Sequence, residues 1–262
     1  MIQNILNKKK FSLRDMNNEK HNVGYMNVAL RNLSSANLFK ITFKNNELDN
    51  EYQITQEFIE LYQHKDIISK FNSLLSYHNK FIDLDDESLI EYNNTIDNCI
   101  DILIELKTKD FREKYFIERF EGVLLGPILN NLGFYNYLNN LNDDNFVLKN
   151  LNDRLRDTLE TIFISSNLIH LENENYKITD KGKYFFNKCA SYGVTCSYIP
   201  TFNNMYNILF GDCSFIWEKD SENNEKHVNR HMNVWGSGGA HKTYFKKIDN
   251  IIISLFNKPL EK

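Results

Sequence analysis

The order of apolar segments between residues 123 and 190 constrains the fold more than any other feature of the sequence. Two helical patterns separated by a polar stretch come first, and two short β-type segments around a turn follow. A capped helix closes the series. In chain order the segments are Val123–Leu132, Asn139–Asn145, Asn152–Ser166, Leu168–Leu171, Glu172–Asn175, Tyr176–Ile178, Thr179–Asp180 and the helix from Lys181. Helix, helix, hairpin and helix is the order of a winged helix, with the turn as the wing.

Helical patterns also precede this module. Residues 1–50 are polar and predict an irregular region with one short strand at Leu38–Phe43. Apolar residues at helical spacing then predict three helices, of which the third is interrupted or kinked by Gly122, Gly126 and Pro127. The three helices are expected at Thr55–Phe81, from Asp86 or Ser88 to Leu106, and at Asp110–Phe120. Together they predict an all-α N-terminal half.

A glycine-rich segment lies near the C-terminal end of the sequence, where Gly236, Gly238 and Gly239 surround Ser237. Glycines lack Cβ, so a backbone of this kind can approach a ligand closely. The simplest interpretation is a turn before a final amphipathic helix, Thr243–Phe256, whose first N–H groups would face an anion. The segment is neither G-x-G-x-x-G nor a P-loop. Too few residues follow it for several βαβ units, so no complete dinucleotide-binding sheet is expected.

Two histidines invite a metal hypothesis, because His227 and His231 stand at i and i+4. On a helix that spacing places both imidazoles on one face. No glutamate between them forms H-E-x-x-H, and no thiolate set with ligand spacing completes the shell. We therefore predict no metal site.

Charge argues against nucleic acid as a partner. The chain has a net charge of −4. The helix that would enter the major groove, Asn152–Ser166, carries Arg154 and Arg156 against Asp153, Asp157 and Glu160. A recognition helix without positive charge is repelled by phosphates. The winged helix is instead expected to serve as a dimerisation or lid module.

Composition places the chain among ordinary globular proteins, with 42% hydrophobic and 25% charged residues. We find no apolar stretch of membrane-spanning length and no signal-peptide pattern at Met1–Lys10, which favours the cytoplasm. The four cysteines form no C-x-x-C pair and are predicted to be free thiols. They are Cys99, Cys189, Cys196 and Cys213.

The second half of the sequence resembles class I S-adenosylmethionine-dependent methyltransferases, in particular the methyltransferase domains associated with polyketide synthases. The resemblance covers roughly residues 111–259. Four stretches carry it: Tyr192–Phe202, Leu209–Gly211, His227–Phe245 and Ile251–Pro259. In that family a helical lid and a winged-helix-like region precede the Rossmann core. The run Asn233-Val-Trp-Gly-Ser-Gly-Gly-Ala-His-Lys-Thr-Tyr-Phe245 resembles the family's segment just before the first core strand.

The resemblance implies roles for individual residues. Six of them fall on the family's cofactor-proximal segment: Gly236, Ser237, Gly238, Gly239, His241 and Tyr244. His241 and Tyr244 stand three apart and are expected to share a helix face. Tyr198 and Arg230 are weaker candidates for the substrate side. For each of these residues, packing of the lid on the core is an equally good interpretation, and no catalytic residue is assigned.

The family's acidic glycine-rich loop would be expected shortly after Pro259, and the sequence ends at Lys262. The resemblance therefore implies an N-terminal portion that binds S-adenosylmethionine only when a Rossmann core is supplied, for example by a second polypeptide. We expect a mostly α fold without a complete Rossmann sheet. It would comprise a helical lid (residues 1–110), a winged-helix-like α+β module (111–200) and a linker with the glycine-rich segment and final helix (201–262). A homodimer through the winged helix is possible in principle. The alternative is a non-enzymatic winged-helix regulatory or protein-interaction module.

Overall fold

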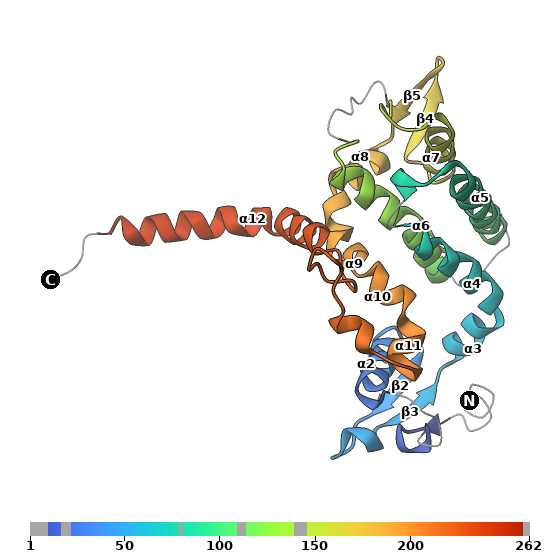
Figure 1. Cartoon of the computed structure of the whole chain (residues 1–262), viewed down its shortest axis with the longest axis vertical. Coiled ribbons are helices and arrows are strands. Elements are labelled where there is room, and N and C mark those ends of the chain that lie inside the picture. Colours follow the sequence, from blue (N-terminus) through green and yellow to red (C-terminus); the bar gives the residue numbers. More distant parts are fainter. Residues whose placement is uncertain (1–9, 17–21, 79–80, 109–113, 139–145, 259–262) are drawn as a thin grey trace. The chain divides into compact units, whose positions relative to one another are not determined.

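The computed structural model of the chain describes residues 10–16, 22–78, 81–108, 114–138 and 146–258 (Figure 1). The chain divides into two compact units, and each unit combines two separate stretches of sequence. Unit 1 contains residues 1–69 and 201–227, and unit 2 contains residues 70–200 and 228–262. The three-part division at residues 110 and 200, which rests on motif order, stays a prediction.

Unit 1 is built around a small antiparallel sheet with the strand order β1–β3–β2. The strands are β1 (Lys10–Phe11), β2 (Phe39–Thr42) and β3 (Glu51–Ile54). Tyr52 of β3 pairs with Phe11 on one side and with Ile41 on the other. Its ring is fully buried and stacks on Phe11 at a centroid distance of 5.7 Å. Aromatic packing of this kind holds a sheet whose strands are too short to be stable alone.

Helix α2 (Val23–Ser35) covers this sheet and contributes Met26 and Leu30 to its core. The later stretch joins the same unit through α11 (Met205–Phe210), because the backbone N–H of Asn22 donates to the Leu209 carbonyl at 2.8 Å. The remaining helical segments between residues 10 and 63 and between 199 and 217 are short. They are η1 (Arg14–Met16), η2 (Glu47–Asp49), α3 (Gln56–Gln63), α10 (Ile199–Asn203) and η6 (Ser214–Trp217).

The expectation of an irregular region over residues 1–50, and of an all-α N-terminal half, was wrong. Of its elements only the strand near Leu38–Phe43 is confirmed, as β2. Strands of two to four residues leave little alternation to detect, and each of β1 and β3 buries a single residue, Phe11 and Tyr52. Pairing across the sheet, which a local pattern does not reveal, decides these strands.

The helices of the central region agree in position with the apolar spacing but differ in their ends. A helix begins beside Thr55 as predicted, and the Thr55 side chain caps α3 by accepting from the Phe58 N–H. The expected Thr55–Phe81 helix is broken at His64, where α3 ends. The following elements are α4 (Lys65–Ser73), η3 (Leu74–Ser76), η4 (Phe81–Asp83) and α5 (Asp86–Thr108).

Helix α6 (Lys114–Phe134) joins two segments that were expected to be separate. The predicted interruption at Gly122, Gly126 and Pro127 was wrong, and the predicted start at Asp110 lies outside the described residues. Pro127 has no N–H for the carbonyl four residues earlier, which belongs to Val123. The imidazole of His78 faces that carbonyl from a fully buried position, although neither ring nitrogen makes a full hydrogen bond. Because this segment is buried in the tertiary structure, α6 continues past Pro127 without interruption.

The winged helix of unit 2 is confirmed in the predicted order. After α6 come α7 (Asp153–Ser165), β4 (Ile169–Glu172), β5 (Asn175–Ile178) and α8 (Asp180–Asn187). Three buried rings, Phe146, Phe163 and Phe186, contact one another at centroid distances of 5.4 to 5.8 Å. They tie the segment before α7, α7 itself and α8 into one core. The polar stretch Asn139–Asn145 lies outside the described residues.

The wing is a tight hairpin in which Glu172 pairs with Asn175. Both central residues have positive φ, 48° at Asn173 and 64° at Glu174. That combination is the primed turn that suits the twist of two antiparallel strands. Thr179 then caps α8, as predicted, by accepting from the Gly182 N–H at 2.9 Å.

The predicted fold class is confirmed: a mostly helical chain with a winged helix and a C-terminal helix. Within the described residues the sheets contain three and two strands, both antiparallel, and no Rossmann sheet is formed. Among these residues, none of the helices has the length and apolar character needed to cross a membrane.

Candidate functional site

The glycine-rich segment lies inside a helix. Helix α12 runs from Arg230 to Phe256, and the side chain of Asn229 caps it by accepting from the Met232 N–H. The expected turn before a helix at Thr243–Phe256 was therefore wrong. The N–H groups of an interior helical segment are used within the helix, so they do not form the expected anion site. Glycine by itself favours a turn over a helix, but here packing of the helix against its own unit outweighs that preference. The contacts of these glycines show this packing.

One face of α12 packs against its own unit at very short distances. A Cβ at Gly236 would lie 2.6 Å from the Cα of Gly193, and a Cβ at Gly239 would lie 2.7 Å from the Cβ of Ala190. These partners belong to η5 (Cys189–Tyr192) and α9 (Gly193–Ser197). The two glycines therefore let the helix backbones touch.

Buried polar and apolar contacts fix the same face. Met232 is 1% exposed, packs with Cys196 and Ile199, and accepts from the side-chain amide of Asn130 at 3.0 Å. The amide of Asn233 donates to the Ser197 hydroxyl at 2.9 Å. We call positions 232, 236 and 239, which follow steps of four and three residues, the inner seam.

The opposite face carries the other predicted site residues. The Ser237 hydroxyl and His241 Nδ1 are 3.5 Å apart, and the His241 ring lies 6.0 Å from the Tyr244 ring, as expected for neighbours on one face. A Cβ at Gly238 would meet nothing within 4 Å. His241 and Tyr244 are exposed. Of the six predicted cofactor-proximal residues, the structure thus exposes Gly238, His241 and Tyr244 on this face, and Ser237 beside them is half-buried.

The two substrate-side candidates lie at the beginning of α12. The Asn229 N–H donates to the Ser197 carbonyl at 2.8 Å, which places Arg230 and Tyr198 beside the same hydrogen bond. Arg230 is exposed and Tyr198 is half-buried. Their role toward a substrate stays a prediction, as does that of the six cofactor-proximal residues.

The comparison with family models falls on these same regions. Residues 121–212 match the AprA winged helix domain, and residues 225–262 match the AprA MT2-like domain. The part of the chain that forms the winged helix is thus similar to that domain. The resemblance to the N-terminal, winged-helix portion of a methyltransferase is thereby confirmed. No curated protein matches the chain significantly.

Two residues that contact α12, Gly193 and Ser197, were not among the predicted site residues. The winged-helix match includes Gly193 and Ser197, and the MT2-like match includes all of α12. Tyr192–Phe202 was noticed only as a stretch of the resemblance. Its small residues, Gly193 and Ser197, were the signal that α12 would pack on it.

Titratable groups near the inner seam are chemically quiet. Burial raises the pKa of the Cys196 thiol to about 12 and also raises the pKa of Cys189. A thiol that stays protonated is a poor nucleophile. His227 precedes α12 and His231 lies within it, so the assumed i, i+4 helix face does not form. Groups of His, Cys, Asp and Glu that would hold a metal are absent from the described part of the chain.

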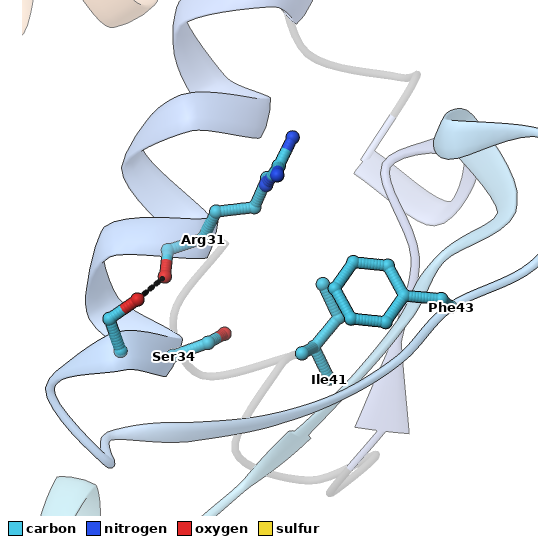
Figure 2. A pocket seen from close by; sticks show the side chains of 5 residues that line it. Arg31, Ser34, Ile41 and Phe43 are labelled. Carbon is cyan, nitrogen blue, oxygen red and sulfur yellow. Dashed lines mark hydrogen bonds between the residues drawn. The ribbon is translucent and has the colours of Figure 1, made fainter.

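A small pocket occurs in unit 1, whereas the predicted site residues belong to unit 2. Its volume is about 270 Å³, and it is lined by Arg31, Ser34, Ser35, Ile41 and Phe43 (Figure 2). The two serine hydroxyls donate to the α2 carbonyls of Leu30 and Arg31. This leaves the Arg31 guanidinium as the donor facing an open apolar floor. Such a shallow site offers too few converging polar groups for specific binding.

Proposed function

We propose that the chain is part of an S-adenosylmethionine-dependent methyltransferase of the polyketide-synthase-associated type. In this proposal it supplies the lid, the winged helix and the helix that closes one side of the cofactor site. A separate Rossmann core supplies the bulk of that site. The support comes from the winged-helix and MT2-like matches together with the surface of α12.

The observation that carries the proposal is the exposure of the last three turns of α12. Eight large apolar side chains there are between 44% and 85% exposed. They are Tyr244, Phe245, Ile248, Ile251, Ile252, Ile253, Leu255 and Phe256. Burying a large apolar side chain contributes about 1.5–3 kcal/mol, so covering eight half-exposed ones contributes on the order of 10 kcal/mol. A helix with such a surface is suited to docking, and the MT2-like match supports the cofactor core as the proposed partner.

In the complete assembly, Ser237, Gly238, His241 and Tyr244 would lie between the winged helix and the core. The core would hold the methyl donor, which supplies an electrophilic methyl group. The residues of this chain would shape one wall of the site and exclude water from it. Gly238 permits the closest approach, since nothing lies within 4 Å of its Cβ position.

Isothermal titration with S-adenosylmethionine tests the dependence on a core. The purified chain alone is expected to bind no cofactor at micromolar concentration, and an MT2-like core domain is expected to restore binding. With the core present, His241→Ala should weaken cofactor binding, whereas Lys246→Ala, which lies on the opposite side of α12, should not. Low-micromolar binding by the isolated chain would contradict the need for a core.

We place the protein in the cytoplasm in this proposal, because its four cysteines are free thiols.

The rival function is a free-standing regulatory module, favoured by the complete buried core of the winged helix. Its α7 surface is weakly suited to DNA, since Arg156 pairs with Asp153 at 2.7 Å. A salt-dependent gel shift on duplex DNA would support the rival, and its absence is the expected result.

A further inference from the structure

Helix α12 has two seams on opposite faces. At about 100° per residue, positions 232, 236 and 239 are followed on the same face by 243, 246 and 250. The side chains there change from Met and Gly to Thr, Lys and Asn. The packing face thus becomes polar after Gly239.

The other seam continues along the helix and changes in the opposite sense. Positions 237, 241, 244, 248, 251 and 255 follow steps of four and three residues, the spacing of a helix-packing seam. They read Ser, His, Tyr, Ile, Ile and Leu. We call this the outer seam. Its apolar arc, widened by Phe245, Ile252 and Phe256, spans about 140° and lies opposite the inner seam.

Lysines border the outer seam on both sides. Lys242 lies beside one edge of the arc and Lys247 beside the other, and Lys258 follows the C-terminal end of the helix. Among the residues that the structure describes, no ion pair is made by these three, whereas Lys10, Lys107 and Lys226 each pair with a glutamate. Asp249 is the one acidic residue of the helix.

From this arrangement we infer that the outer seam docks onto an apolar strip bordered by carboxylates, on the face of α12 opposite the winged helix. The inference deepens the proposed function, since the partner in question is the cofactor core. Lysine stems extend the apolar contact while their ammonium groups reach the rim, where opposite charges set orientation and partner choice. A second copy of this chain is a poorer occupant, because it would bring lysine borders together.

Two synthetic helical peptides serve as probes of the docking surface. Both carry the same leucine seam, one bordered by glutamates and the other by lysines. Fluorescence anisotropy with the full chain is expected to show at least tenfold tighter binding of the glutamate-bordered peptide. This preference should shrink about tenfold between 50 mM and 500 mM salt, because the border charges are exposed.

Charge reversal locates the effect on the helix. The double variant Lys242→Glu/Lys247→Glu is expected to reverse the preference between the two peptides. The single change Asn250→Glu alters charge on the inner-seam face and should leave the preference unchanged. All three side chains are exposed, and circular dichroism checks that each variant is folded.

Equal binding of the two peptides, or an equal effect of Asn250→Glu and Lys247→Glu, would overturn the inference. So would a stable homodimer of the full chain that Ile248→Glu dissociates, as measured by analytical ultracentrifugation. None of these results affects cofactor binding in the presence of a core. Failure of that titration with an intact peptide preference would instead sink the proposed function alone.

Discussion

Two glycines on one helix are expected to respond in opposite directions to the same substitution. Replacing Gly by Ala inside a helix stabilises it by about 1 kcal/mol, because alanine loses less backbone entropy. At Gly238 nothing lies within 4 Å of the new methyl group, so Gly238→Ala should gain about 0.5–1 kcal/mol.

At Gly236 the same methyl group meets backbone. It would lie 2.6 Å from the Gly193 Cα, 2.8 Å from the Gly193 carbonyl carbon and 2.9 Å from the Val194 nitrogen. Backbone atoms do not rotate away, so the cost lies at the upper end of the 1–3 kcal/mol typical of overpacking. After subtraction of the helix gain, Gly236→Ala should lose about 2 kcal/mol. That loss corresponds to roughly 4–8 °C in Tm for a unit of this size.

Urea unfolding followed by Trp235 fluorescence measures both variants. The Trp235 ring packs edge-on against Phe134 at 5.5 Å, so it reports on the contact between α12 and α6. Trp217 is 79% exposed, and Trp217→Phe in all samples removes its background signal. If both alanine variants were equally stabilised, α12 would not pack on α9 in solution, and the assignment of the inner seam would fall with it.

Two further substitutions and one thiol-reactivity measurement test the fold. Glu174 has a φ of 64°, so Glu174→Gly in the wing should stabilise the domain by about 1 kcal/mol in urea unfolding, and an unchanged midpoint would argue against the primed turn. Burial lowers the pKa of His78 to about 3, below its ordinary 6.5. The unfolded chain therefore binds more protons below about pH 6.5, and stability should fall by up to about 1.4 kcal/mol per pH unit between pH 6 and 3. His78→Phe should flatten that profile in acid titrations, and an equally steep profile would exclude His78 as the cause. Burial also raises the pKa values of Cys99 and Cys196, to about 11 and about 12, so both thiols should react with a disulfide reagent at pH 8 only as fast as the protein unfolds.

Sequence patterns predicted the winged helix because each of its elements has a local signal. Thr179 caps α8 through its own hydroxyl, and α7 shows apolar residues at helical spacing that become its buried Leu155, Leu159 and Ile162. Unit 1 has no comparable signal. Phe11 and Tyr52 become a core pair only when β1 and β3 meet, and the later α11 completes that unit from the far side of the sequence.

The glycine-rich segment shows how one local pattern supports two physical outcomes. Three glycines in four residues are compatible with a turn, and they are also compatible with a helix that packs directly against another backbone. The choice depends on Gly193, which lies more than forty residues away and has no Cβ either. Propensity alone favours the turn, whereas the pairing of Gly236 with Gly193 makes the helix the better packed state.

This packing also bears on the predicted roles of the six residues. A helix whose inner seam is closed by glycines cannot offer that same face to a cofactor, so Gly236 and Gly239 are accounted for by contact with Gly193 and Ala190. Within the described chain, no such contact accounts for the exposed Gly238, His241 and Tyr244, and the exposure is unfavourable for Tyr244, whose side chain is 63% exposed. An exposed face of this kind, continued by the apolar side chains after it, fits a helix that contacts two neighbours. One neighbour is the winged helix. The other, in the proposed function, is the cofactor core, which would contact the lysine-bordered outer seam.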